Sequence, residues 1–207
     1  MNHPDLFSTD ERFTPVRMPD AEVYFLRHLS TGLSDSRIFN ELVADTPWKQ
    51  EDVIVWGKKH PQPRLIAWYG DRGRAYSYSG ISMLPLPWTN LLLHMKRCVQ
   101  ERAEAHFNSV LLNFYRDHRD SMGFHSDDEK ELGQEPTLAS LSYGAERTLV
   151  FKHKRDKSIP DFKLALPHGS MLLMKGPTQR NWKHGLLKQA KPCGPRVNLT
   201  FRNILGK

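Results

Sequence analysis

The chain has 207 residues and a mass of 24.0 kDa, with 39% hydrophobic and 26% charged residues. This length fits one large domain, and the composition supports a packed core beneath a well-solvated surface. No apolar run approaches the roughly 18 residues that cross a bilayer, and the polar N-terminus lacks a secretory signal pattern. Two cysteines are too few for a disulfide framework or a cysteine-built zinc site. We therefore expect a soluble monomer without a membrane partner, cytoplasmic or, in a eukaryote, nuclear.

The formal net charge is +7, and it is unevenly distributed. Residues 150–207 carry 13 lysines and arginines against two aspartates, whereas residues 1–149 carry 17 basic against 21 acidic residues. A concentration of positive charge favours a polyanionic partner, and nucleic acid is the first candidate. Charge alone does not identify that partner.

The N-terminal part begins with a polar segment followed by a strand and a helix. Residues 1–18 are rich in Asp, Pro, Thr and Ser, which predicts a flexible arm ahead of a single domain over residues 19–207. A strand is expected over residues 21–29. Ser34 is placed to cap a helix whose apolar residues recur at helical spacing until Pro47 ends it.

The middle of the chain alternates strand and turn signals before a longer helix. Two strands, over residues 53–56 and 65–69, flank an exposed basic hairpin at residues 57–63, and a short strand follows over residues 75–79. Apolar residues between positions 88 and 105 recur at helical spacing. A proline just before them is tolerated at a helix start, so a second helix is expected there.

Short strands separated by turn residues dominate the remainder. Such strands indicate a sandwich or jelly roll, and no repeat, low-complexity tract or linker divides the chain. The expected fold class is α+β, with helices packed outside a β-barrel-like core. The predicted strands cover residues 110–115, 137–143, 148–153, 162–166, 170–174 and 196–202.

Polar residues recur at every second position in three places, where strand geometry puts both side chains on one face. For the last of these strands alone, a solvated polar face opposite an apolar one is the simpler interpretation. The three sets are Asn113 with Tyr115, His125 with Asp127, and the series Arg196, Asn198, Thr200 and Arg202.

The His125-Ser-Asp127 motif favours a metal site. A histidine and a carboxylate on one face can reach a single ion, and one further histidine completes the facial triad of non-haem Fe(II) oxygenases. His184 is the preferred third ligand, because a glycine follows it and an arginine-containing strand begins twelve positions later. His153 lies in a basic strand end and His168 in a turn. Oxygenases of this class need cations near the metal to bind an acidic cosubstrate.

In this order, the motifs resemble those of the AlkB family of Fe(II)- and 2-oxoglutarate-dependent dioxygenases, which repair alkylated nucleobases. The Asn-x-Tyr, His-x-Asp, His and Arg-x-Asn-x-Thr-x-Arg elements are complete, and the resemblance covers about residues 53–203. It implies a double-stranded β-helix, that is, a jelly roll, with a core over about residues 108–204 and helices outside it. It also implies an N-terminal nucleotide-recognition lid, with hairpins over about residues 50–80.

The resemblance assigns roles to the polar sets. His125, Asp127 and His184 would hold Fe(II). Two arginines six positions apart on one strand face would each bind one carboxylate of 2-oxoglutarate, and which arginine binds which carboxylate stays open. O2 is the remaining cosubstrate. The residues implied around 2-oxoglutarate are Asn113, Tyr115, Arg196, Asn198, Thr200 and Arg202.

The resemblance also implies a pocket for a base that is flipped out or presented on a single strand, because a base inside a duplex cannot reach buried iron. Tyr78 would stack on that base, with Tyr76 and Ser79 lining the pocket. Asp128 and Glu129 would read the base edge. The alternative for these two acids is a solvated turn.

Trp56 and Gly57 resemble the tip of a finger that duplex-acting AlkB members insert in the vacated position. Alternatively, Trp56 belongs to the core at the end of a strand. Cations around this hairpin are expected to meet nucleic-acid phosphates. They are Lys58, Lys59, Arg64, Arg72 and Arg74.

The resemblance therefore implies oxidative demethylation of bases of the 1-methyladenine or 3-methylcytosine type, in DNA or also RNA, as alkylation-damage repair. The reaction would use Fe(II), 2-oxoglutarate and O2 and release formaldehyde, succinate and CO2. One alternative is the same chemistry on a protein, lipid or small molecule, which leaves the base-pocket tyrosines and the basic segment without a role. Another is a non-catalytic nucleic-acid-binding jelly roll, which gives no reason for three ligands and two arginines together.

Overall fold

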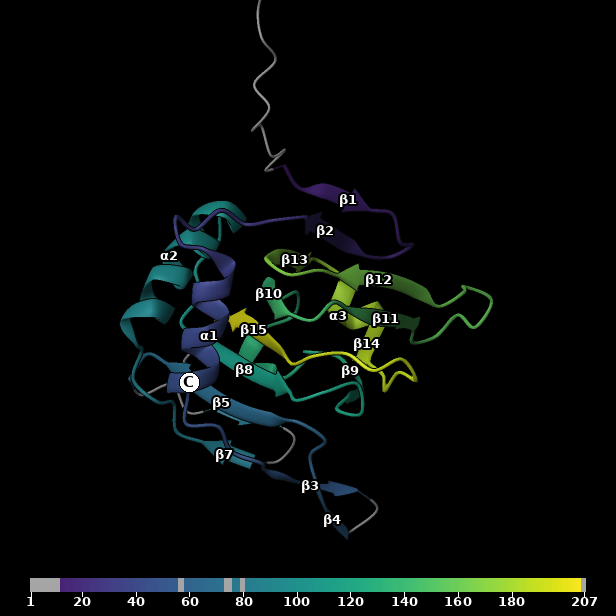
Figure 1. Cartoon of the computed structure of the whole chain (residues 1–207). Helices are drawn as coiled ribbons and strands as arrows, with labels where there is room; N and C mark the ends of the chain where they lie inside the picture. Colours follow the sequence, from purple (N-terminus) through teal and green to yellow (C-terminus); the bar gives the residue numbers. More distant parts are fainter. Residues whose placement is uncertain (1–11, 56–57, 73–75, 79–80, 206–207) are drawn as a thin grey trace, which may run out of the picture.

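Short strands account for most of the fold in the computed structural model, which describes residues 12–55, 58–72, 76–78 and 81–205. The larger sheet has seven antiparallel strands in the order β1-β2-β13-β10-β15-β8-β5 (Figure 1). Four of its strands come from the C-terminal half predicted to form the core, and three come from earlier residues. The strands are β1 (Thr14–Val16), β2 (Glu22–Leu26), β5 (Leu65–Gly70), β8 (Ser109–Tyr115), β10 (Leu138–Gly144), β13 (Ser170–Lys175) and β15 (Arg196–Arg202).

A smaller sheet of four strands, in the order β12-β11-β14-β9, packs against one face of the larger sheet. Two separate hairpins, β3–β4 and β6–β7, precede the second helix. The strands of the smaller sheet are β9 (Met122–His125), β11 (Arg147–His153), β12 (Phe162–Leu166) and β14 (Trp182–Leu186). The hairpin strands are β3 (Asp52–Val55), β4 (Lys58–Pro61), β6 (Tyr76–Tyr78) and β7 (Ile81–Met83).

Two helices, α1 (Asp35–Asp45) and α2 (Asn90–Ala103), cover the other face of the larger sheet (Figure 1). Each begins where a hydroxyl caps a free backbone N–H: Ser34 accepts from Arg37 in α1, and Thr89 accepts from Leu92 in α2. The remaining helical segments are α3 (Thr178–Asn181) and the 3-10 turn η1 (Lys130–Leu132). No helix in the described ranges is long and apolar enough to span a membrane.

The strand β15 is buried on both faces. Its apolar residues Val197, Leu199 and Phe201 join the core beneath α1 and α2. The polar face is also buried, because it points at the pocket between the two sheets rather than at solvent. The solvated-face interpretation of this strand is therefore wrong, and two buried arginines on it require a functional explanation.

Two predictions about the N-terminal third need correction. Residues 14–18 do not belong to a flexible arm: β1 pairs with β2, and Met18 is buried against the core between the sheets, while residues 1–11 lie outside the described residues. The basic segment after Val55 is not simply a loop between two strands. Its residues Lys58–Pro61 form β4, which pairs with β3, whereas β5 joins the larger sheet.

Candidate active site

A pocket opens between the two sheets, lined by the polar face of β15 on one side and by β9 and β14 on the other. It gathers all nine residues that the sequence singled out for metal and cosubstrate, although they are up to 89 positions apart, from 113 to 202. The register explains this: Asn198 lies opposite Asn113, and Arg196 opposite Tyr115, in the β15–β8 pair. The nine are Asn113, Tyr115, His125, Asp127, His184, Arg196, Asn198, Thr200 and Arg202.

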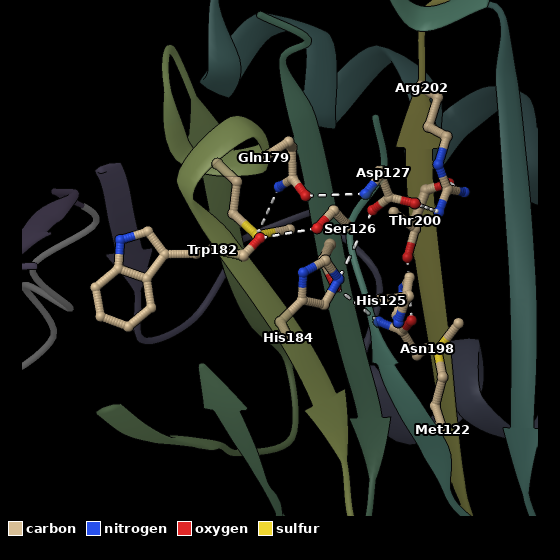
Figure 2. A network of polar contacts seen from close by, with 12 residues as sticks. Met122, His125, Ser126, Asp127, Gln179, Trp182, His184, Asn198, Thr200 and Arg202 are labelled. Atoms are coloured by element: carbon tan, nitrogen blue, oxygen red, sulfur yellow. Dashed lines mark hydrogen bonds and ion pairs between the residues drawn. The ribbon is translucent and has the colours of Figure 1, made fainter. Parts of the chain in front are cut away.

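His125, Asp127 and His184 converge on one point of this pocket (Figure 2). His125 is the last residue of β9 and lies opposite His184 of β14, with their ring centroids 4.4 Å apart. Asp127 follows in the loop just beyond β9, not within a strand, and its Oδ2 is 3.7 Å from Nε2 of His184. One potential ligand atom from each residue lies within 4.8 Å of the others, so the three can share one ion.

The protonation of these groups fits a divalent metal. Burial lowers the pKa of His184 to about 3 and also lowers the pKa of His125, so both imidazoles are neutral at neutral pH. Burial alone would raise the pKa of Asp127, but the charge and hydrogen bond of Arg202, together with the two neighbouring histidines, outweigh burial and hold that pKa far below its ordinary value. Two neutral imidazoles and one carboxylate are the donor set of the facial triad.

The hydrogen bonds of these residues also leave the expected metal-ligand atoms available to an ion. Nδ1 of His125 is 3.0 Å from the carbonyl oxygen of Gly123, to which it can donate, and this tautomer leaves Nε2 as the lone-pair nitrogen. Oδ1 of Asp127 accepts from Nη2 of Arg202 at 2.7 Å. Oδ2 of Asp127 is buried and has no hydrogen-bond donor among the described residues. A buried carboxylate oxygen of this kind is explained by a metal ion that it would bind.

Two further residues hold the loop that carries Asp127, and the sequence did not indicate either. The buried Gln179 of α3 accepts the backbone N–H of Asp127 at 3.0 Å, and Ser126 donates to the carbonyl of Trp182 at 3.0 Å (Figure 2). Both contacts tie the loop to the chain around the start of β14, only a few residues before His184. A four-residue helix gives no periodic pattern, so the burial of Gln179 left no signal in the sequence.

The two arginines of β15 occupy opposite ends of the pocket. Arg202 is 1% exposed and lies at the metal end, against Asp127. Arg196 is 2% exposed; its Nη2 donates to Oγ of Ser142 at 2.9 Å, and its guanidinium lies 5.2 Å from the Tyr115 ring centroid. A slot with a cation at each end suits an elongated dianion.

The residues between these arginines form one hydrogen-bonded row. Nδ2 of Asn198 donates to Oγ of Ser140 and to the carbonyl of Leu141, both at 2.8 Å. Thr200 donates to Oδ1 of Asn198 at 3.1 Å. Because this bond satisfies the amide oxygen of Asn198, Thr200 fixes the orientation of that amide.

Arg64 lies inside the protein, not on a phosphate-binding surface. It is 5% exposed, and its Nε donates to Oδ1 of Asn113 at 2.8 Å. The prediction that it meets phosphate is corrected on these grounds: a basic neighbourhood suggested exposure, but an amide in β8 accepts from the guanidinium. Arg64 thereby orients a pocket residue.

The residues expected to contact the base are described in part. Asp128 has a side chain that is 58% exposed and pairs with Lys154 at 2.8 Å, and Glu129 is half-buried. The backbones of Tyr76 and Tyr78 lie in β6, in the second hairpin, but their side chains are not described. Trp56, Gly57 and Ser79 lie outside the described residues, so the finger and core alternatives for Trp56 both stay open.

Comparison with protein families identifies this arrangement. A family model described as the 2OG-Fe(II) oxygenase superfamily matches residues 22–202, which include the triad and both arginines. The chain belongs to this superfamily. The 2OG-Fe(II) oxygenases require Fe(II), 2-oxoglutarate and O2, and the His125–Asp127–His184 set supplies a potential iron site.

Relatives of this 2OG-Fe(II) oxygenase include alpha-ketoglutarate-dependent dioxygenase alkB homolog 3 of Mus musculus, 43% identical over 175 residues, covering 81% of this chain and 60% of the relative. DNA oxidative demethylase ALKBH2 of Mus musculus is 40% identical over 178 residues, covering 82% and 74%. The chain thus spans about 60% of the length of the first of these relatives. The solved structure of OsALKBH1 shares the fold, with a TM-score of 0.60 at 16% identity, covering 93% of this chain and 100% of that one.

Proposed function

We propose that this protein oxidatively demethylates alkylated bases in nucleic acid, with Fe(II), 2-oxoglutarate and O2. The observation that carries the proposal is the His125–Asp127–His184 set, in which Asp127 and His184 are buried, with Arg202 at its side and Arg196 at the far end of the same pocket. The names of the relatives support the substrate class, because ALKBH2 is a DNA oxidative demethylase. The basic C-terminal segment supports it as well.

In this proposal, His125, Asp127 and His184 hold Fe(II). Arg202 faces the metal-proximal carboxylate of 2-oxoglutarate and Arg196 the distal one, as their positions at the two ends of the pocket suggest. Bound iron and cosubstrate supply the oxidising chemistry: the alkyl carbon is hydroxylated, the product collapses to the plain base and formaldehyde, and succinate and CO2 leave.

The chain itself positions and shields these groups. Asn113 and Tyr115, opposite Asn198 and Arg196, offer hydrogen bonds to the cosubstrate from β8. Arg202 keeps Asp127 ionised and directs one of its oxygens away from the metal position. Apolar residues from both sheets, including Leu186, line the same pocket and exclude water from it.

The substrate base enters flipped out of a duplex or from a single strand. Tyr78 stacks on it, Tyr76 and Ser79 line its pocket, and Asp128 and Glu129 read its edge. Asp128 lies one residue after the metal ligand Asp127, which supports this placement. The proposed role of Trp56 and Gly57, which rests on the sequence resemblance alone, is to fill the vacated position in a duplex. The active protein is a monomer in this proposal.

The test is detection of formaldehyde and of the product base from methylated oligonucleotides. The panel contains 1-methyladenine or 3-methylcytosine in single-stranded DNA, double-stranded DNA and RNA, each with and without 2-oxoglutarate. Formaldehyde and plain base that depend on 2-oxoglutarate support the proposal. Cosubstrate turnover without base repair on any member would instead point to a protein, lipid or small-molecule substrate.

A further inference from the structure

A second buried arginine lies next to the distal end of the pocket. Arg147, the first residue of β11, is 2% exposed, as is Arg196. Both guanidiniums lie near the ring of Tyr115, at 6.0 Å for Arg147 and 5.2 Å for Arg196, measured to the ring centroid. Arg196 lines the pocket and Arg147 does not, so Arg147 can act there only through its neighbours and through its charge.

Arg147 fixes the chain around Tyr115. Its Nη1 donates to the carbonyl of Asp117 at 3.1 Å, and its Nη2 donates to the carbonyls of Asp120 at 3.0 Å and Leu187 at 2.7 Å. The loop that follows Tyr115 is thereby joined to the chain that follows β14. All three acceptors are neutral, so the hydrogen bonds satisfy the two terminal nitrogens of the guanidinium without cancelling its charge.

Two cations of the same sign are thus buried close together. Within the described ranges, neither guanidinium forms an ion pair with a carboxylate, and Nε of each has no hydrogen-bond acceptor. Burial, together with the charge of Arg147, lowers the pKa of Arg196 to about 10, and Tyr115 opposes this only in part. Buried charges are normally compensated, so this end of the pocket is built for an anion.

We propose that Arg147 is a positioning residue for the distal carboxylate of 2-oxoglutarate. It holds Tyr115 in place and adds a second positive charge behind Arg196, which favours dicarboxylates over monocarboxylates. The inference rests on the proposed function, because that function places the distal carboxylate at Arg196.

The test compares two ligands that differ only at the distal end. Binding of 2-oxoglutarate and of 2-oxobutyrate, which lacks the distal carboxylate, is measured by calorimetry on Mn(II)-loaded protein without oxygen, so no turnover contributes. The readout is the ratio of the two Kd values. A residue with a purely structural role would change stability but not this ratio.

Three variants separate charge from scaffolding. Arg147→Gln can still donate to carbonyls but has lost the charge, and we expect its preference for 2-oxoglutarate to fall about tenfold, as for one charge at roughly 10 Å. Arg147→Lys keeps the charge and should retain the preference within about threefold. Arg37→Gln is the matched control, because Arg37 has a side chain that is 66% exposed on α1 and should leave the ratio unchanged.

A folded Arg147→Gln protein with the wild-type ratio would overturn the inference. If that variant does not fold, Arg196→Gln decides the matter: the charge of Arg147 should leave a residual preference for 2-oxoglutarate of about tenfold, and a ratio of one would refute it. Failure of the proposed function gives a different result. A different substrate would leave this ratio unchanged and show only in the base-repair assay, whereas a pocket that does not bind 2-oxoglutarate would give no preference in wild-type protein.

Discussion

The pair between Arg202 and Asp127 makes a prediction that needs neither metal nor substrate. Both residues are 1% exposed, and Nη2 of Arg202 is 2.7 Å from Oδ1 of Asp127. At an effective dielectric constant of about 20, the attraction between unit charges at this distance is about 6 kcal/mol. Arg202→Met removes the cation together with its own desolvation penalty but leaves the buried carboxylate.

We therefore expect Arg202→Met to lower the free energy of unfolding of metal-free protein by about 3–5 kcal/mol, the range for breaking a buried pair from one side. For a domain of this size, that corresponds to a fall in Tm of about 6–20 °C. Urea unfolding and calorimetry, with a chelator present, measure both quantities. Arg37→Met, at an exposed position, is the control and should stay within about 0.5 kcal/mol of wild type.

A double-mutant cycle with Asp127→Asn isolates the pair. The coupling free energy between positions 127 and 202 should be about 2–3 kcal/mol, so the double variant is more stable than the sum of the single losses implies. A loss below about 1 kcal/mol in Arg202→Met, or additive losses in the cycle, would refute the electrostatic role given to Arg202.

Three further predictions concern the metal and the cosubstrate. His125→Ala should abolish Co(II) binding, followed by its visible absorption, with an unchanged circular dichroism spectrum; retained binding would exclude His125 as a ligand. Gln179→Leu should weaken Co(II) binding roughly 10- to 100-fold, because the backbone N–H of Asp127 loses its acceptor. Gln179→Glu keeps an acceptor and should bind Co(II) more tightly than Gln179→Leu. Equal Co(II) affinities of the two variants would show that this hydrogen bond is unimportant. Arg64→Met should raise the KM for 2-oxoglutarate with kcat largely kept, because Asn113 loses its donor. An unchanged KM would contradict that role.

Strands and helices were predicted well where the residue pattern within a single element determines that element. The alternation in residues 196–202 predicted β15 with its exact bounds, and Ser34 caps α1 as its position ahead of an apolar helical repeat predicted. The pattern did not predict that the polar face of β15 is buried. That burial depends on a second sheet packed over it, which no residue within β15 encodes.

The candidate site was predictable to the extent that ligand chemistry restricts residue types. The triad and the arginines were selected because a metal and a dicarboxylate need those donors at those spacings. The sequence did not predict the roles of Gln179 and Arg147 or the inward orientation of Arg64. Each of these residues acts through a contact that spans more than 25 positions. The partners are backbone or amide groups, which carry no sequence signature. The loop position of Asp127 was missed for a similar reason: a residue two beyond His125 can share its ion from a loop as well as from a strand.

The central claim is that this pocket couples 2-oxoglutarate oxidation to removal of an alkyl group from a base. Succinate and repaired base, quantified together from one reaction on methylated oligonucleotide, test it most directly. We predict one succinate for each repaired base, with neither product formed by Asp127→Ala. Base repair that proceeds without 2-oxoglutarate, or that survives Asp127→Ala, would contradict the account.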